Sequence, residues 1–315
     1  MHAFVTGSSG FVGSWLLRHL EDSGDTVTSC AADITDAPSL QKELLAVSPQ
    51  AVYHLAGQAN VGASWNDTVA TFEVNAVGTL NVLEAVRQLP MRPRVLVIGS
   101  ADVYGTVKAD DLPLTEDTPL RPVSPYAASK VAAEFVALQA YLGYGTPVIR
   151  ARAFNHVGPG QNEGFVVSAL AKRIAEAERA GTTAVSVGNL DTRRDFSDVR
   201  DVVRAYRLLM EHGTPGEVYN VCSGNDISIR EIADRLMAAS GHRLDFVVSG
   251  DQQRSVDVPV LSGDSSRLRA ATGWAPLIPL DQTLADALGW WRQQLGSETT
   301  TPTEPVAAAV GARTD

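Results

Sequence analysis

Three glycines spaced three residues apart near the N-terminus constrain the fold of this chain more than any other feature. Gly7, Gly10 and Gly13 follow a short apolar run at 2–6 and precede an amphipathic segment at 11–20. This order is typical of a strand, turn and helix that hold a dinucleotide, because glycine permits a tight turn and a close approach of the pyrophosphate. A structural turn without a ligand uses the same residues, so the motif favours nucleotide binding without defining the use of the nucleotide.

Apolar and amphipathic segments alternate from this turn to about residue 155. We expect strands at 2–6, 51–55, 94–98 and 147–152, and helices at 11–20, 72–87 and 126–141. Strands that are apolar on both faces and separated by helices predict a parallel sheet covered on both sides. The expected fold class is therefore α/β, a Rossmann-type doubly wound parallel sheet with a smaller mixed α/β lobe at the C-terminal end.

The pattern loosens after residue 156. Helices are expected at 166–180, 199–211 and 229–239, and strands at 184–187 and 218–221. We divide the chain into a nucleotide-binding domain at 1–155, whose sheet is completed by parts of 183–222, and a substrate lobe mainly at 156–296. The segment 297–315 is rich in Thr, Pro and Ala without periodicity, and we expect it to be disordered.

Composition excludes several classes of function. The net charge of -10 argues against nucleic acid as a partner, since phosphate backbones require a basic surface. The two cysteines, Cys30 and Cys222, give neither a disulfide framework nor the spacing of a metal site, so no metal is expected. The chain shows no signal peptide and no apolar run of ~18 residues, which predicts a soluble, cytoplasmic protein without membrane contact.

The residues that usually distinguish NAD from NADP are missing after the second expected strand. An acid there holds the ribose 2′-OH of NAD, and an arginine accommodates the 2′-phosphate of NADP. This chain instead has TVTSCAA at 26–32, then DITD at 33–36. We expect Asp33 and Ile34 near the adenine, although Asp33 and Asp36 also suit the cap of a helix at 37–45. The choice between NADP(H) and NAD(H) stays open, with NADP(H) slightly favoured.

A serine, a tyrosine and a lysine form the candidate catalytic set. Ser100 follows the expected strand at 94–98, and the carboxyl ends of parallel strands are where such sheets bind ligands. Tyr126 and Lys130 are four residues apart and therefore share one face of a helix. A phenol titrates near ~10, and a cation one turn away, together with a nicotinamide ring, would lower its pKa. A solvated helix pair is the alternative for this spacing alone.

These motifs identify the chain as similar to the extended short-chain dehydrogenase/reductases. The resemblance spans about residues 1–294 and rests on TGSSGFVG, HLAG at 54–57, Asn75 in FEVNAVGTLNVLEA, Ser100 before VYG, Y-x-x-x-K and RRDFSDVRDVV at 193–203. Within the nucleotide-sugar enzymes of this family, RAFNHVGPGQ at 152–161, VGNLDTRRDFSDVRD at 187–201, VYNVCSG at 218–224 and TGWAPLIPL at 272–280 resemble the GDP-4-keto-6-deoxy-mannose reductase branch.

The resemblance implies a role for each matched position. The residues implied to bind the cofactor are Gly7, Gly10, Phe11, Val12, Gly13, Asp33, Ile34, Leu55, Ala56, Gly57, Asn75, Tyr126, Lys130, Phe154 and His156. The implied catalytic residues are Ser100, Tyr126, Lys130 and Asp102. The residues implied to bind the nucleotide sugar are Ser100, Asn155, Phe165, Val166, Lys172, Asn189, Arg194 and Arg254. Arginine suits a diphosphate because it gives bidentate contacts.

Three reactions are compatible with this set. The branch resemblance favours NAD(P)H-dependent reduction of a 4-keto-6-deoxyhexose bound to GDP or dTDP, such as GDP-4-keto-6-deoxy-mannose or the dTDP-linked allose form. A 4,6-dehydratase with tightly bound NAD needs an additional acid and base, for which Asp102 is short and lacks an acidic neighbour. A 4-epimerase needs only Ser100, Tyr126, Lys130 and room for the sugar to turn.

A non-enzymatic alternative is a Rossmann domain that senses NAD(P) without turning it over. Such proteins commonly lose the tyrosine or the lysine, and this chain retains both Tyr126 and Lys130. The family resemblance also implies a homodimer through helices at 80–87 and 131–140. The alternative for these helices is that their apolar stripes only cover the sheet.

Overall fold

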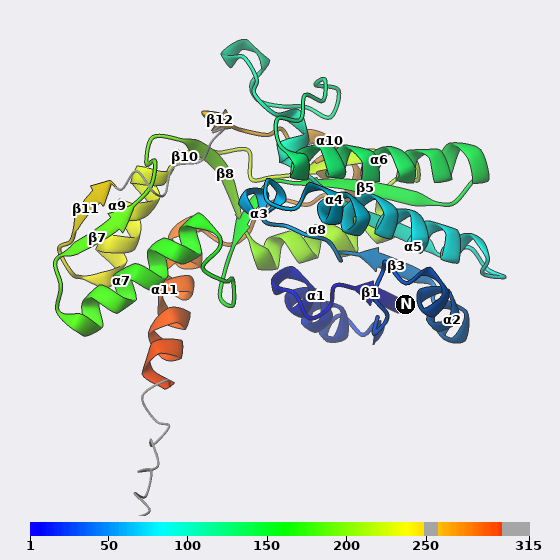
Figure 1. Ribbon diagram of the computed structural model, residues 1–315, viewed down its shortest axis with the longest axis horizontal. Coiled ribbons are helices and arrows are strands. Elements are labelled where there is room, and N and C mark those ends of the chain that lie inside the picture. Colours follow the sequence, from blue (N-terminus) through cyan, green and yellow to red (C-terminus); the bar gives the residue numbers. More distant parts are fainter. Residues whose placement is uncertain (249–257, 298–315) are drawn as a thin grey trace, which may run out of the picture.

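The computed structural model describes residues 1–248 and 258–297 (Figure 1). Arg254 and residues 298–315 lie outside the described residues, and with them almost all of the segment expected to be disordered. Residue 297 is the exception, because Ser297 ends the last helix.

Six parallel strands form the main sheet in the order β2-β1-β3-β4-β5-β9. Their bounds are β1 (His2–Thr6), β2 (Thr26–Ser29), β3 (Ala51–His54), β4 (Arg94–Ser100), β5 (Val148–Ala153) and β9 (Val218–Val221). The chain runs outward from β1 to β2 and then crosses back to β3, so the strand order reverses at β1. Ligands of open α/β sheets bind at the carboxyl ends of the strands beside such a reversal.

Helices cover both faces of this sheet (Figure 1). On one face, α1 (Phe11–Asp22) and α8 (Val199–His212) pack their apolar side chains against the strands. On the other face lie α2 (Ala37–Val47), α5 (Gly78–Arg87) and α6 (Pro125–Tyr144). The expectation of a doubly wound α/β sheet is therefore confirmed.

The helix expected at 72–87 is interrupted by a wide turn. The chain forms α3 (Val61–Ser64) and α4 (Thr68–Phe72), then a π-helical turn over Glu73–Val77, and only then α5. At the junction of this turn with α5, the Thr79 hydroxyl donates to the carbonyl of Asn75 at 2.6 Å. The periodicity of the sequence does not predict the π turn. Asn75 lies within this turn, and its side chain is buried.

Local signals fix both ends of α6, the helix that carries the candidate catalytic pair. The Ser124 hydroxyl accepts a hydrogen bond from the Ala127 amide at 3.1 Å, and Pro125 occupies the first turn. Gly145 ends the helix with a φ of 67°. The helix therefore extends a few residues beyond the predicted range of 126–141 at its C-terminal end.

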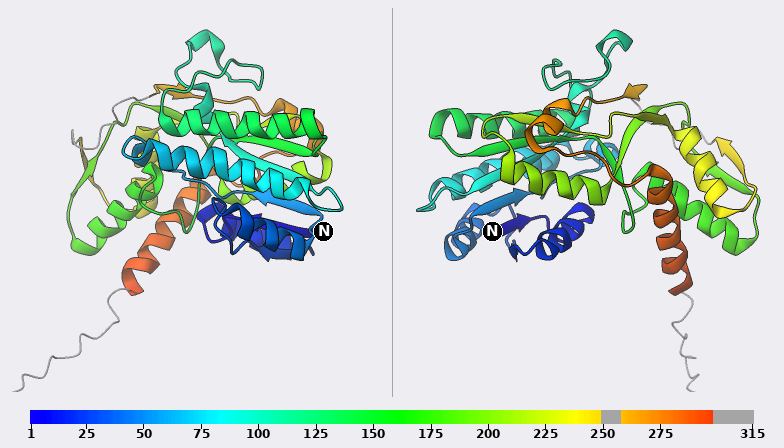
Figure 2. Two further views of the ribbon diagram at one scale, coloured as in Figure 1. Left: turned by 45° about the vertical axis from the view of Figure 1, so that its right-hand side comes forward. Right: turned by 180° about the vertical axis from the view of Figure 1, so that it is seen from behind.

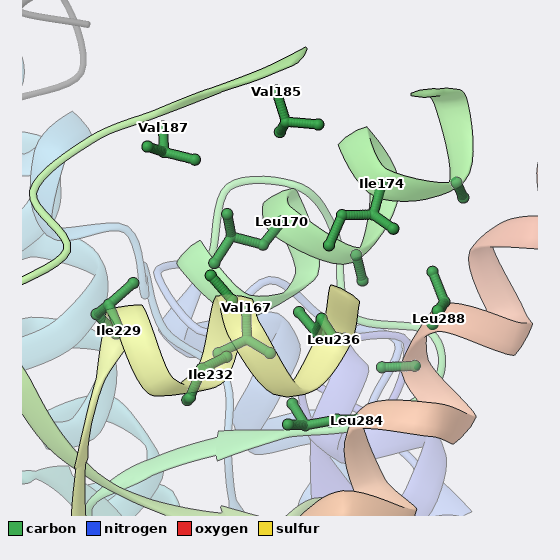
Figure 3. Close-up of a cluster of buried hydrophobic side chains, with 14 of the residues drawn as sticks. Val167, Leu170, Ile174, Val185, Val187, Ile229, Ile232, Leu236, Leu284 and Leu288 are labelled. Carbon is green, nitrogen blue, oxygen red and sulfur yellow. The ribbon is translucent and has the colours of Figure 1, made fainter. Parts of the chain in front are cut away.

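A second lobe lies to one side of the main sheet (Figure 2). It contains α7 (Val166–Ala180), α9 (Ile229–Ser240), α11 (Leu280–Ser297) and a two-stranded sheet of β7 (Ala184–Val187) and β11 (Asp245–Val248). Figure 3 shows the core of this lobe, where leucine, isoleucine and valine side chains of the three helices and β7 meet. The lobe is thus assembled from segments that are distant in the sequence.

A further sheet connects the two parts. Here β8 (Arg193–Asp198) lies between β10 (Asp226–Ser228) and β12 (Val260–Leu261), and β6 (Asn155–Val157) pairs with β8 as well. The short α10 (Ser266–Thr272) then packs near α8. Within 183–222, β9 joins the main sheet, whereas β7 pairs with β11 in the second lobe.

Candidate active site

The turn after β1 has no space for a side chain at two of its three glycines, Gly7 and Gly13. Gly7 has a φ of 71°, and a Cβ there would lie 2.6 Å from the Ala56 nitrogen. A Cβ on Gly13 would lie 2.1 Å from the Gly7 carbonyl oxygen, and the Gly10 amide donates to that same oxygen at 3.1 Å. The turn therefore brings bare backbone to the start of α1, where a phosphate finds the positive end of the helix.

A cleft runs from this turn along the carboxyl ends of the strands, and most of the predicted site residues line it. These are Gly7, Gly10, Phe11, Val12, Gly13, Leu55, Gly57, Ser100, Asp102, Tyr126, Lys130, Phe154, Asn155, His156, Phe165 and Arg194. The structure thus brings the glycine turn and the serine, tyrosine and lysine into one cleft. Asp33, Ile34, Ala56, Asn75, Val166, Lys172 and Asn189 do not line it.

Ser100 and Tyr126 face each other in this cleft. Ser100 ends β4 and begins a 3₁₀ turn over Ala101–Tyr104, where its hydroxyl accepts from the Asp102 amide at 3.2 Å. Burial raises the pKa of Tyr126 well above its ordinary value, the charge of Asp102 raises it further, and a hydrogen bond with Ser100 opposes both. The phenol is therefore held protonated at neutral pH.

Lys130 lies one helical turn after Tyr126 and is nearly as buried. Its ammonium donates to the Ile98 carbonyl at 3.0 Å, and burial lowers its pKa to about 8. The expected lowering of the tyrosine pKa by this lysine is not what governs the phenol here, because burial and Asp102 act in the opposite direction. A Cβ on Gly57 would come within 3.4 Å of the Lys130 nitrogen, so the lysine reaches the edge of the β3 loop.

His156 forms part of the cleft wall as a neutral imidazole. Its ring stacks on Phe11 with centroids 6.3 Å apart and planes 11° apart. The Nδ1 atom lies 2.9 Å from the Phe154 carbonyl oxygen, which assigns the proton to Nδ1. Burial lowers the pKa of His156, so this wall carries no positive charge.

Asn75 lies behind the cleft rather than along it. Its side-chain oxygen accepts from the Gln58 amide at 2.8 Å, and its amide group donates to Ser129 at 2.9 Å and to the Gln58 carbonyl at 3.1 Å. Asn75 thereby connects the loop after β3 to α6, the helix that carries the candidate pair Tyr126 and Lys130. A role for it in direct cofactor contact stays a prediction.

The two aspartates after β2 have different local roles. Asp36 accepts from the Ser39 amide at 3.2 Å and caps α2, which confirms the capping interpretation for this residue. Asp33 instead accepts from the amide and hydroxyl of Thr35, both at 2.8 Å, and forms a local turn. Ile34 is buried against Gly78 of α5.

A second cleft opens between the N-terminal half of α7 and the segment that runs from the end of β7 into β8. Five of the residues predicted to bind the nucleotide sugar line this second cleft. They are Asn155, Phe165, Val166, Asn189 and Arg194. Three of these, Asn155, Phe165 and Arg194, also line the first cleft, so the two clefts are adjacent. Lys172 lines neither cleft, and its ammonium forms an ion pair with Glu163 at 2.5 Å.

Sequence reasoning missed several residues that line these clefts. Gln58, Asn60, Gln161 and Tyr206 line the first cleft, and Glu163 and Arg173 line the second. Gln58 directly follows HLAG and was therefore detectable from its position. Tyr206 gave no signal, because it sits within the apolar stripe of α8.

The structure has no helix in residues 1–248 or 258–297 that is long and apolar enough to span a bilayer.

Comparisons with known proteins agree with the geometry of the site. The family model described as GDP-mannose 4,6 dehydratase matches residues 22–287. The chain is 38% identical to GDP-6-deoxy-D-mannose reductase of Pseudomonas aeruginosa over 94% of its length and 98% of the relative. A solved structure of RMD from Pseudomonas aeruginosa complexed with NADPH superposes with a TM-score of 0.87 over 93% of this chain and 99% of that one.

A plant relative extends the comparison to the dehydratases. GDP-mannose 4,6 dehydratase 2 of Arabidopsis thaliana is 31% identical over 90% of this chain and 77% of its own length. Epimerases share the fold too, as a UDP-glucose 4-epimerase of Thermus thermophilus in complex with NAD has a TM-score of 0.83 at 27% identity, covering 93% of this chain and 99% of that one. The resemblance seen in the motifs is confirmed, and the chain belongs to the GDP-mannose 4,6-dehydratase family of extended short-chain dehydrogenase/reductases.

Proposed function

We propose that this protein is an NAD(P)H-dependent 4-ketoreductase that acts on a nucleotide-activated 4-keto-6-deoxyhexose. The observation that carries the proposal is the 38% identity to GDP-6-deoxy-D-mannose reductase, which extends over nearly the whole of both chains. The cleft supports the same reaction, since it combines the glycine turn with Ser100, Tyr126 and Lys130. The dehydratases of Vibrio cholerae and Arabidopsis thaliana share less of the sequence, at 28% and 31% identity.

The first cleft fits a dinucleotide. Gly7 and Gly13 leave no room for a Cβ, and the turn presents backbone at a helix N-terminus, as a pyrophosphate requires. The side-chain oxygen of Gln58, a residue that lines the same cleft, is buried and has no hydrogen-bond partner within residues 1–248 and 258–297. When bound there, a reduced nicotinamide supplies the hydride that ketone reduction needs.

The protein's own residues supply the proton and the orientation. Reduction of a ketone leaves an alkoxide, which requires a proton donor. Tyr126 is suited to this task because burial and Asp102 raise its pKa and keep the phenol protonated. Ser100 shares a hydrogen bond with Tyr126 and is placed to hold the same substrate oxygen. Lys130 supplies positive charge at the floor of the cleft while its pKa of about 8 leaves it protonated at neutral pH.

The second cleft suits the nucleotide part of the substrate. Arg194 lies where the two clefts meet and provides a cation for a diphosphate, to which arginine binds with two parallel hydrogen bonds. Phe165 and Asn189 offer an apolar face and an amide to a base. We infer a GDP-linked substrate from the relative at 38% identity, with a dTDP-linked sugar as the alternative.

A 4,6-dehydratase is the second candidate, and Asp102 is the observation that favours it. This carboxylate lines the cleft and acts on the pKa of Tyr126, so an acid is within range of the reacting sugar. An aspartate side chain is nevertheless one methylene shorter than that of a glutamate, and Asp102 stands between Ala101 and Val103 without an acidic neighbour. A 4-epimerase uses the same serine, tyrosine and lysine.

One experiment separates these reactions. The purified protein is incubated with NADH or NADPH and either GDP- or dTDP-4-keto-6-deoxyhexose, while absorbance of the reduced nicotinamide is followed. Loss of absorbance that depends on the keto sugar is the expected result. Conversion of GDP-mannose or dTDP-glucose without added cofactor would instead identify a dehydratase. Binding of a dinucleotide without turnover of any sugar would leave only a sensing role.

A homodimer and a cytoplasmic location complete the proposal. Helices α5 and α6 lie side by side on one face of the sheet (Figure 1). They and the turn before α5 expose the apolar side chains of Val77, Leu80, Phe135 and Leu142, which are between 40% and 72% accessible. An apolar face of this kind supports association of two copies through these helices. Sedimentation equilibrium tests it, with a monomer at micromolar concentration as the contrary result.

A further inference from the structure

The loop that follows β2 lies beside the glycine turn. Strands β1 and β2 pair in parallel up to Val5 and Ser29, and the Cys30 amide donates to the Val5 carbonyl at 2.9 Å. Residues 30–32 therefore flank the turn that begins at Gly7. In a Rossmann sheet, this is where the adenosine ribose meets the protein and where the presence of a 2′-phosphate is read.

This loop offers no side-chain cation to a phosphate. The sequence has neither lysine nor arginine from residue 19 to residue 41, while it has five carboxylates over the same stretch. Arg18, which ends the preceding stretch, lies over the ring of Trp15 on α1 at 5.3 Å. Lys42, which follows the stretch, is exposed on α2. A 2′-phosphate carries close to two negative charges and is held by arginine where NADP is preferred.

The backbone donors of the loop are already bound to a carboxylate. The two side-chain oxygens of Glu43 on α2 accept from the amides of Ala31 and Ala32, both at 2.9 Å. The Cys30 thiol approaches the same carboxylate at 3.8 Å, and its own pKa is raised to about 11 by burial and by Glu43, so the thiol adds no second charge. Amides that elsewhere cradle an anion here point toward Glu43, whose negative charge lies directly behind the loop.

From this arrangement we infer that the protein binds NADH in preference to NADPH, and that Glu43 is the residue that determines this preference. The inference rests on the proposed use of a nicotinamide cofactor. Glu43 acts by repelling the 2′-phosphate and by withholding the two amides, whereas the ribose hydroxyl of NADH is uncharged and is not repelled. The inferred preference differs from the cofactor in the solved structure of Pseudomonas RMD, which is complexed with NADPH.

Dissociation constants of the two reduced dinucleotides test the inference without any sugar substrate. They are measured on the full chain from nicotinamide fluorescence at low ionic strength. We expect NADH to bind at least tenfold more tightly than NADPH, and the difference to shrink at 0.5 M salt, because the discrimination is electrostatic. Equal or tighter binding of NADPH overturns the inference while leaving the ketoreductase proposal in place. Binding of neither dinucleotide overturns both.

Two variants identify the residue responsible. Glu43→Gln removes the charge and is expected to tighten NADPH binding severalfold while NADH binding stays within twofold. Asp234→Asn, which removes one exposed charge from the second lobe, is the matched control and leaves both constants unchanged. Since Glu43→Gln also weakens the loop, Ala31→Arg serves as a second variant that keeps Glu43 and adds a cation at an exposed position. If neither variant improves NADPH binding relative to NADH, Glu43 and its loop do not set the preference.

Discussion

Arg152 on β5 donates two hydrogen bonds to the carboxylate of Glu134 on α6, from Nε at 2.9 Å and from Nη2 at 2.7 Å. Both side chains are almost fully buried. Burial alone would lower the pKa of Arg152, but the hydrogen bonds to Glu134 raise it above its ordinary value. The third nitrogen of the guanidinium donates to the Tyr104 hydroxyl at 2.8 Å. A single cation thus joins the helix of Tyr126 to the turn that follows Ser100.

This pair predicts a large loss of stability when its carboxylate is neutralised. Glu134→Gln removes the carboxylate that pairs with the buried Arg152 and the nearby Arg150, and breaking a buried pair typically costs about 3–5 kcal/mol. Urea denaturation measures the free energy of unfolding. Glu84→Gln, which breaks an exposed pair with Arg87, is the control and is expected to cost less than about 1 kcal/mol. Equal losses in the two variants would contradict the assignment.

Two buried tyrosines are expected to respond differently to loss of the hydroxyl. The Tyr104 hydroxyl accepts from Arg152 and donates to Asn220 at 2.7 Å, so Tyr104→Phe leaves both partners unsatisfied and costs about 1–3 kcal/mol. The Tyr206 hydroxyl is buried without a partner among the described residues. Tyr206→Phe is therefore expected to leave the free energy of unfolding unchanged or slightly increased. Comparable destabilisation of the two variants would mean that Tyr206 has a partner in solution.

The proposed role of Tyr126 as the proton donor predicts a defect in turnover without a defect in cofactor binding. Tyr126→Phe removes the donor and is expected to lower kcat by about 10²- to 10⁴-fold. The dissociation constant of NADH, measured by fluorescence, should stay within a few-fold of that of the unmodified protein. Tyr141→Phe on the same helix controls for general effects on α6. Retention of full kcat in Tyr126→Phe would exclude this tyrosine as the acid.

Substitution of Asp102 distinguishes the proposed ketoreductase reaction from a dehydratase reaction. Reduction needs no acid beyond the phenol, so Asp102→Asn should keep kcat for the keto sugar within about tenfold. The exposed Asp110→Asn on the neighbouring loop is the control. A fall of more than about a hundredfold in the Asp102 variant alone would show that the carboxylate takes part in proton transfer.

The buried Lys130 predicts a specific dependence of stability on pH. Its pKa falls from 10.5 to about 8 on folding, so between these values the unfolded chain binds more protons than the folded one. The free energy of unfolding therefore rises with pH between about 8 and 10.5, and this gain is lost as the pH falls from 10.5 to about 8. We expect the free energy of unfolding to rise by about 1–2 kcal/mol from pH 8 to pH 9.5 relative to Lys130→Met. Parallel curves for the two proteins would contradict a buried charged lysine.

Local chemistry made the centre of the site predictable from the sequence. The left-handed backbone of Gly7, the strand-end position of Ser100 and the four-residue spacing of Tyr126 and Lys130 are each features of a single turn, strand or helix. Such features leave a signature in spacing and residue type. The same holds for Asp36, whose cap on α2 is made to a residue three positions later.

The supporting network was not predictable, because its partners are far apart in the chain. Asn220 on β9 is hydrogen-bonded through its backbone and side chain to residues around Glu116, more than a hundred positions earlier. Glu134 and Arg152 lie in mainly apolar stretches, and nothing in the local sequence indicates that the two side chains form a buried ion pair. The pairing of β7 with β11 has the same cause, since about sixty residues separate the two strands and no local signal connects them.

The discontinuous origin of the second lobe limits how such an enzyme can be recombined. Its core comes from α7, α9 and α11, and between the first two the chain returns to the main sheet to form α8 and β9. No single crossover in the gene can therefore exchange this lobe for that of a relative with another nucleotide specificity. A working chimaera would have to inherit all three helices from one parent, so changes of substrate in this family are more readily reached by point substitutions along the clefts than by transplanting a module.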